Sequence, residues 1–196
     1  MNRPDISTKL IHFTKGSDEE AFRRLQKIIS DRALNGTKEK IKGQYPCVCF
    51  SEAPIQSIGG TLCNQSGNTE YSPFGIRVSK RWLFALGGRP VIYQPDREFL
   101  LLPVDLRWRH MRYELRDDLP DVDFCWEREW RIRCDPLPFD SQSAQIVVAG
   151  EKWKQRLLSA HAAYAESCVM DAGLQVDQVL AEYYRPPFPW DVITLE

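Results

Sequence analysis

The chain lacks the features that define several large classes of protein. Its six cysteines include no pair with CxxC spacing and only three histidines are present, which argues against a structural zinc site. No apolar run approaches the length of a membrane-spanning helix, and no apolar signal core opens the sequence. The net charge of −1 gives no general attraction to nucleic acid or membrane. We therefore expect a cytoplasmic protein that does not contact a membrane.

What remains is an ordinary globular composition, with 43% apolar and 27% charged residues. At 196 residues the chain fits one domain and is long enough to bury a core. We expect a single domain over residues 1–196, with its core at about 10–150 and a helical C-terminal extension over 151–196.

Apolar periodicity and turn residues predict many short strands with helices between them. The predicted strands span residues 10–14, 46–51, 74–78, 90–93, 127–134 and 144–148. The predicted helices span 17–35, 79–83 and 151–168, with shorter segments after Pro54 and near 176–183. Residues 63–70 are expected to form a loop, and residues 95–125 show no clear period. This order favours an α+β fold with a largely antiparallel sheet and flanking helices.

The run from Trp126 to Arg133 stands out because two carboxylates alternate with arginines. In an extended chain successive side chains point to opposite faces. One face would then carry Arg128, Trp130 and Ile132, and the other Glu127, Glu129, Arg131 and Arg133. Such a face suits a polar cleft for an anionic, hydroxyl-rich ligand. It also suits a solvated sheet face held by cross-strand ion pairs.

Three segments in order resemble the ADP-ribosyltransferase superfamily. They are Ile11-His12-Phe13-Thr14, Cys49-Phe50-Ser51-Glu52 and Glu127-Arg128-Glu129-Trp130. The opening segment is similar to that of DNA-modifying ADP-ribosyltransferase toxins. The segments Tyr71–Ile76, Pro90–Tyr93 and Glu127–Arg131 are similar to the AbiGi family of abortive phage-resistance proteins. The resemblance covers about residues 10–150 and implies a split, largely antiparallel sheet.

The resemblance also implies roles for individual residues. Glu129 would stabilise the oxocarbenium-like ribose of NAD through its 2-hydroxyl, and Glu127 would position or deprotonate the acceptor. His12, Thr14 and Ser51 would hold the cofactor, and His12 would also count among the catalytic residues. His12, Ser51 and Glu129 should converge on one pocket. Arg77, Arg131 or Arg133 would bind the diphosphate, Tyr71, Phe74 or Tyr93 would stack on nicotinamide, and no metal is implied.

Other interpretations remain open at this point. His12 can be a hydrogen-bonded structural histidine, and Ser51 can cap the segment that follows it. The whole chain can be an AbiGi-like partner module without catalysis, or a metal-dependent nuclease using Glu127, Glu129 and Asp123. For the enzyme, the resemblance implies NAD as substrate, a nucleic-acid or protein acceptor, and a cognate antitoxin in a toxin–antitoxin or phage-defence setting.

Overall fold

A seven-stranded sheet forms the centre of the protein. The computed structural model describes residues 6–53, 71–171, 178–183 and 185–195. Across the sheet the strand order is β11-β10-β4-β1-β3-β8-β5. In that order the strands span Val192–Thr194, Ala144–Val148, Tyr71–Ser79, Lys9–Lys15, Cys47–Ser51, Glu129–Arg133 and Arg89–Pro90. All pairs are antiparallel except β10–β11, which confirms the α+β class with a largely antiparallel sheet.

One face of this sheet, here called the core face, packs against helices. Helix α1 (Asp18–Asp31) starts with a capping box between Ser17 and Glu20. Its buried Phe22 and Leu25 join the strand residues of the main core. Those strand residues include Leu10, Val48, Phe50, Ile76, Trp130, Ile132 and Ile146. Short apolar runs bounded by turn residues are what made these strands predictable.

Two smaller apolar clusters cover the opposite face of the sheet. One contains Ile11, Phe13 and Val147, with Tyr71 packed against it. The other contains Ile41, Cys47 and Trp108. Between the two clusters this face carries polar side chains, and the candidate site lies there.

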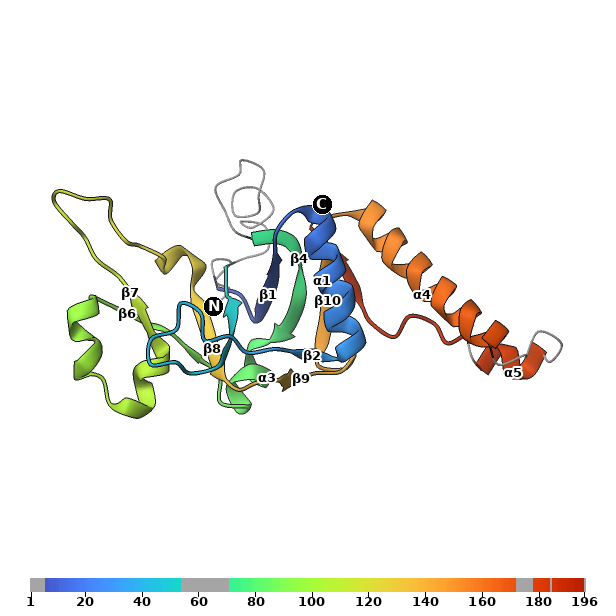
Figure 1. Cartoon of the computed structure of the whole chain (residues 1–196), viewed down its shortest axis with the longest axis horizontal. Coiled ribbons are helices and arrows are strands. Elements are labelled where there is room, and N and C mark those ends of the chain that lie inside the picture. The colour runs from blue at the N-terminus through green and yellow to red at the C-terminus, as the bar shows by residue number, and fades with distance from the viewer. Residues whose placement is uncertain (1–5, 54–70, 172–177, 184, 196) are drawn as a thin grey trace.

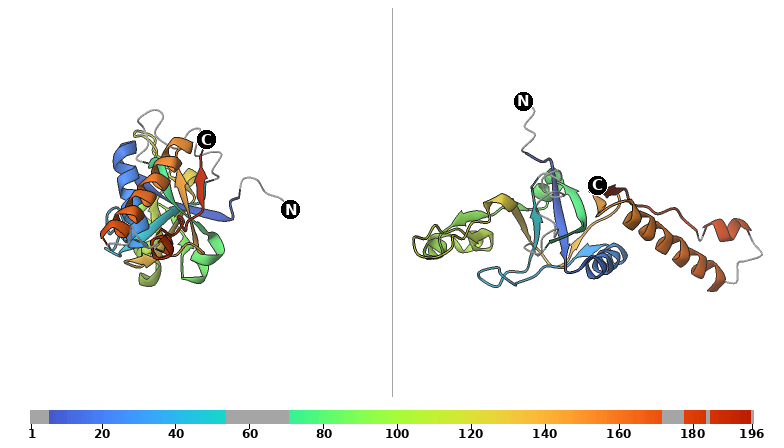
Figure 2. Two further views of the ribbon diagram at one scale, coloured as in Figure 1. Left: turned by 90° about the vertical axis from the view of Figure 1, so that its right-hand side faces the viewer. Right: turned by 90° about the horizontal axis from the view of Figure 1, so that it is seen from above.

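Two lobes extend from opposite sides of the sheet (Figure 1). One holds the short helices η2 (Asp96–Leu101) and η3 (Val104–Arg109) and a two-stranded parallel sheet of β6 (Ile92–Gln94) and β7 (His110–Arg112). The other is an arm of helix α4 (Glu151–Asp171) with α5 (Gln178–Tyr183) at its end (Figures 1 and 2). The remaining elements are β2 (Ala33–Leu34), paired with β9 (Leu137–Pro138), helix α3 (Lys80–Ala85) and η4 (Cys125–Glu127). Over the described ranges, no helix has both the length and the apolar character needed to cross a bilayer.

The structure corrects several predicted boundaries. Helix α1 stops at Asp31, before the expected Asn35, because Arg32 takes the left-handed conformation (φ 50°) and the chain turns into β2. The predicted strand 90–93 divides between β5 and β6, which belong to different sheets. Predictions for the segment after Pro54 and for residues 63–70 lie outside the described residues.

The strand predicted over 127–134 is shorter than expected. Glu127 closes the helix η4, Arg128 has a left-handed conformation with φ 46°, and β8 begins only at Glu129. Trp130 and Ile132 do share the core face. Arg128 lies outside the strand and so does not belong to their alternation.

Replacing a ring in the main core should be costly for stability. Phe74 is fully buried against Phe22 and Trp153. We expect Phe74→Ala to lower the free energy of unfolding by about 3–5 kcal/mol, because a cavity is left where a ring was packed. The measurement is urea denaturation, with Phe84→Ala as control because Phe84 is 51% exposed. Equal effects of the two variants would contradict this description of the core.

Candidate functional site

A transverse row of paired residues crosses the sheet at the candidate site. From β10 to β8 the partners are Gln145, Arg77, Ile11, Ser51 and Glu129. Directly paired residues of an antiparallel sheet point to the same face. This register places Ser51 and Glu129 side by side on the opposite face, with Arg77 three strands away at roughly 15 Å between Cα atoms.

Glu129 is held in a buried ion pair with Arg131. Nε of Arg131 lies 2.8 Å from Oε1 of Glu129, and Nη2 lies 3.2 Å from Oε2. Glu129 is 6% exposed and Arg131 only 1%. Nη1 of Arg131 also donates to the backbone carbonyls of Trp108 and His110, at 3.1 and 2.8 Å. Arg131 is therefore committed to Glu129 and to the lobe, which leaves little of its donor capacity for the predicted diphosphate.

Glu127 is the more accessible carboxylate of the pair. The hydroxyl of Tyr71 donates to its Oε2 at 3.1 Å. Burial, followed by the charge of Glu129, raises the pKa of Glu127 to about 7, while the bond from Tyr71 and the charge of Lys15 oppose that rise. Burial also raises the pKa of Tyr71, so its hydroxyl stays protonated. Glu127 is thus able to exchange a proton near neutral pH.

Two hydroxyl groups fix the backbone around these carboxylates. The Tyr93 hydroxyl accepts from the backbone N–H of Glu129 at 3.1 Å and donates to the carbonyl of Phe124 at 3.2 Å. The Ser51 hydroxyl donates to the carbonyl of Glu127 at 2.8 Å and accepts from the N–H of Ala53 at 3.1 Å. Both side chains therefore position the turn between η4 and β8.

His12 lies one residue out of the row. Its partner on β4 is Ile76, and its ring packs edge-on to Phe50 at 5.8 Å between centroids. Both neighbours belong to the main core, so the register puts His12 on the core face. Nδ1 of His12 lies 2.8 Å from the carbonyl oxygen of Cys49, and burial lowers its pKa. The structure brings Ser51 and Glu129 together, but it does not bring His12 to them.

Three other predicted ligand residues are placed away from the carboxylates. Phe74 lies in the main core and has no face open to a ligand. Thr14 is buried, and its hydroxyl donates to the carbonyl of Phe74 at 3.1 Å. Burial lowers the pKa of Arg77, and the charge of Asp191 opposes that shift from the far side of the row. Of the predicted aromatic residues, Tyr71 alone reaches a carboxylate through its own side chain.

Sequence reasoning missed two parts of this site. The thiol of Cys49 lies against Glu129, and burial together with that charge raises its pKa. The carbonyl acceptors of Arg131 come from Trp108 and His110, within a segment that shows no periodicity. The pairing of Cys49 with Arg131 across β3 and β8 follows only from the register of the two strands, which the sequence does not give.

Comparison with known proteins gives no further guidance, because no family model, no curated protein and no solved structure matches this chain. Among the residues that the structure describes, no group of three His, Cys, Asp or Glu side chains is placed to hold a metal ion.

Breaking the ion pair should destabilise the fold strongly. We expect Arg131→Met to lower the free energy of unfolding by about 3–5 kcal/mol, because Glu129 would be left buried without its partner. The double variant Glu129→Gln, Arg131→Met should recover part of this loss, because no unpaired charge remains. Chemical denaturation of the three proteins gives the measurement. An Arg131→Met protein as stable as wild type would show that Arg131 has no such structural role.

Glu127 should make stability depend on pH in a defined direction. Its folded pKa of about 7 exceeds the ordinary value of 4.5, so the folded protein binds the proton more tightly than the unfolded chain does. Its contribution is present below about pH 4.5 and is lost as the pH rises to about 7. We therefore expect Glu127→Gln to be more stable than wild type at pH 8, by about 1–3 kcal/mol.

At pH 4.5 the same two proteins should be nearly equal in stability. The control is Glu19→Gln, because Arg156 lowers the pKa of that exposed carboxylate and no gain at pH 8 is expected. Denaturant midpoints measured at both pH values decide the matter. A constant difference between wild type and Glu127→Gln would mean that Glu127 titrates normally.

Proposed function

We propose that this protein transfers ADP-ribose from NAD to a macromolecular acceptor, a nucleic acid or a protein. The observation that carries the proposal is the pair of unlike carboxylates beside Ser51. Glu129 is buried and fixed by Arg131, whereas Glu127 is half-buried with a pKa of about 7. Two carboxyl groups in different environments suit two different roles in glycosyl transfer.

Glu129 would act on the sugar of NAD. Its oxygens accept bonds from Arg131, and the Cys49 thiol also bonds to this carboxylate. Lone pairs remain among the roughly four that a carboxylate offers. One of these can accept from the ribose 2-hydroxyl and stabilise positive charge as the bond from C1 of the ribose to nicotinamide breaks. Nicotinamide leaves with the electron pair of that bond. Arg131 acts through Glu129 by fixing the direction of its carboxylate.

Glu127 would act on the acceptor. A carboxylate with a pKa close to the working pH is suited to take a proton in the transition state. The acceptor then forms its bond to C1 while Glu127 receives the proton. Tyr71 keeps Glu127 in place through its hydroxyl and presents an aromatic ring beside it. Lys15, whose Nζ lies 5.4 Å from the centroid of that ring, supplies a cation for the diphosphate.

His12 has no part in the reaction in this proposal. Its ring nitrogen joins β1 to the carbonyl of Cys49 on β3, where the two strands share a single register pair. The split character expected of the sheet is supported by that weak pairing. A role in toxin–antitoxin or phage-defence systems rests on the resemblance of motifs alone.

The two carboxylates should give different kinetic results. We expect Glu129→Gln to lower both NAD hydrolysis and transfer by about 10²–10³, because a charge-stabilising group is removed from the transition state. Glu127→Gln should retain hydrolysis and lose transfer, because attack by water depends less on proton removal by Glu127 than attack by a macromolecular acceptor does. The assay follows labelled NAD and labelled product in a cell lysate, with Glu19→Gln as control. Equal losses of both activities in both variants would remove this division of roles.

The same assay separates the alternatives. Transfer that persists in excess chelator and requires NAD supports the proposal. Nucleic-acid cleavage that needs Mg²⁺ and not NAD would favour the nuclease. That alternative is weakened by Asp123, whose Oδ1 accepts from the N–H of Cys125 at 2.7 Å and so caps η4. A folded protein without either activity would favour the partner module, in which the Glu129–Arg131 pair is purely structural.

A further inference from the structure

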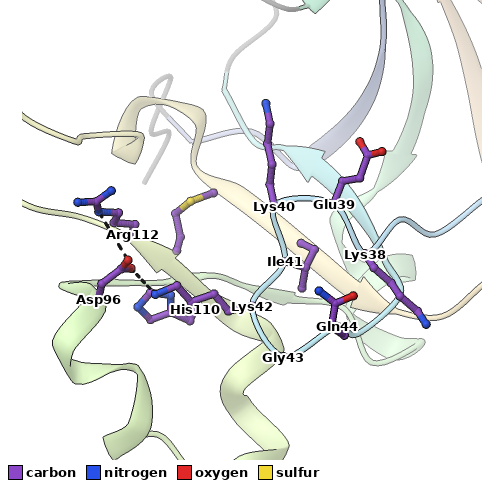
Figure 3. A pocket seen from close by; sticks show the side chains of 11 residues that line it. Lys38, Glu39, Lys40, Ile41, Lys42, Gly43, Gln44, Asp96, His110 and Arg112 are labelled. Carbon is purple, nitrogen blue, oxygen red and sulfur yellow. Dashed lines mark ion pairs between the residues drawn. The ribbon is translucent and has the colours of Figure 1, made fainter.

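A cavity lies between the loop Lys38–Gln44 and the lobe. Its volume is about 630 Å³, within the range of small-molecule sites. One wall is the loop, and the other is formed by Asp96 from η2 with His110, Met111 and Arg112 from β7 (Figure 3). Two of these residues also contact Arg131 of the carboxylate site, because the carbonyl of His110 accepts from it and Sδ of Met111 lies 3.9 Å from its Nη2.

His110 presents an unsatisfied nitrogen in this cavity. The side chain is 3% exposed, and Nε2 has no hydrogen-bond partner among the described residues. The ring donates to the carbonyl of Pro95, which leaves Nε2 as an acceptor in the neutral ring. Burial is the main cause that lowers the pKa of His110, so the neutral form is the one present at pH 7. Buried polar atoms are normally hydrogen-bonded, and a hydroxyl group of a ligand would supply the missing hydrogen bond to Nε2.

The charges around the cavity favour an anion. Its lining residues include four cations, Lys38, Lys40, Lys42 and Arg112, against two carboxylates, Glu39 and Asp96. Lys42 and Arg112 both contact Asp96, with Nζ of Lys42 2.6 Å from Oδ1 and Nε of Arg112 3.8 Å from Oδ2. Nη2 of Arg112 also pairs with Oε2 of Glu114 at 2.5 Å. Lys38 and Lys40 extend from the outer side of the loop (Figure 3), so they add positive potential and not direct contacts.

We propose that this cavity binds a phosphorylated sugar of the kind found in nucleotides. Lys42 and Arg112 would contact the phosphoryl group, in part replacing their contact with Asp96, while Nη2 of Arg112 keeps its pair with Glu114. His110 Nε2 would accept from a sugar hydroxyl. The same chemistry is offered by a free nucleotide and by an RNA strand, and the proposal does not depend on the carboxylate site.

The test is calorimetric titration of the whole protein with ribose 5-phosphate and with inorganic phosphate. We expect ribose 5-phosphate to bind more tightly, by about two- to tenfold, because only it offers a hydroxyl to His110. His110→Phe should abolish that preference while keeping the edge contact with Phe99. The double variant Lys42→Gln, Arg112→Gln should lose at least about tenfold in affinity for both ligands. The matched control is Lys27→Gln, because that lysine lies exposed on α1.

Misfolding could also explain a loss of binding, so the test includes a variant that should bind phosphate more tightly. Asp96→Asn should tighten phosphate binding, because a competing carboxylate is neutralised. Weaker binding in Asp96→Asn, unchanged binding in the double variant, or no binding of either anion at millimolar concentration would overturn the proposal. Displacement of ribose 5-phosphate by AMP identifies a free nucleotide as the source. If a short oligoribonucleotide displaces ribose 5-phosphate at lower concentration than AMP does, and the double variant loses this effect, the source is an RNA strand.

Discussion

The buried ion pair of Glu129 and Arg131 is the interaction on which the rest of the site depends. Arg131 uses one edge of its guanidinium for the carboxylate and the remaining nitrogen for the carbonyls of Trp108 and His110. Arg131 therefore joins the central sheet to the lobe, alongside the Tyr93 hydroxyl that accepts from the N–H of Glu129. Buried charges are tolerated only when they are paired and hydrogen-bonded, so the position of β7 and the direction of Glu129 are determined together.

This arrangement also explains why two carboxylates so close in sequence differ so much. Glu129 is paired with a cation, whereas Glu127 faces an uncharged phenol and the negative charge of Glu129. Desolvation without a paired cation raises the pKa of a carboxyl group. A carboxyl group whose pKa lies near neutrality is typical of acid–base sites in enzymes, and here burial of Glu127, followed by the charge of Glu129, raises that pKa.

The sequence predicted those parts of the fold that depend on local pattern. The capping box at Ser17, the strands β1, β3, β4 and β10, and the burial of Trp130 and Ile132 follow from periodicity and helix-start signals. The site was predicted less well, because it depends on register. Whether His12 shares a face with Ser51 is decided by a shift of one residue between β1 and β3, and no local pattern carries that information. Arg131 looked like a ligand for phosphate because its carbonyl partners lie more than 20 residues away.

The left-handed residue between the carboxylates has a consequence for how such a site can change. Glu129 owes its direction to the pleat of β8, and shifting that strand by one residue would turn all of its side chains to the other face. Glu127 stands before Arg128, outside the pleat, on a turn closed by hydroxyl groups. Changes in the length or sequence of that turn can therefore move Glu127 while Glu129 stays in place. The sheet therefore sets the position of Glu129, and the turn sets that of Glu127 separately.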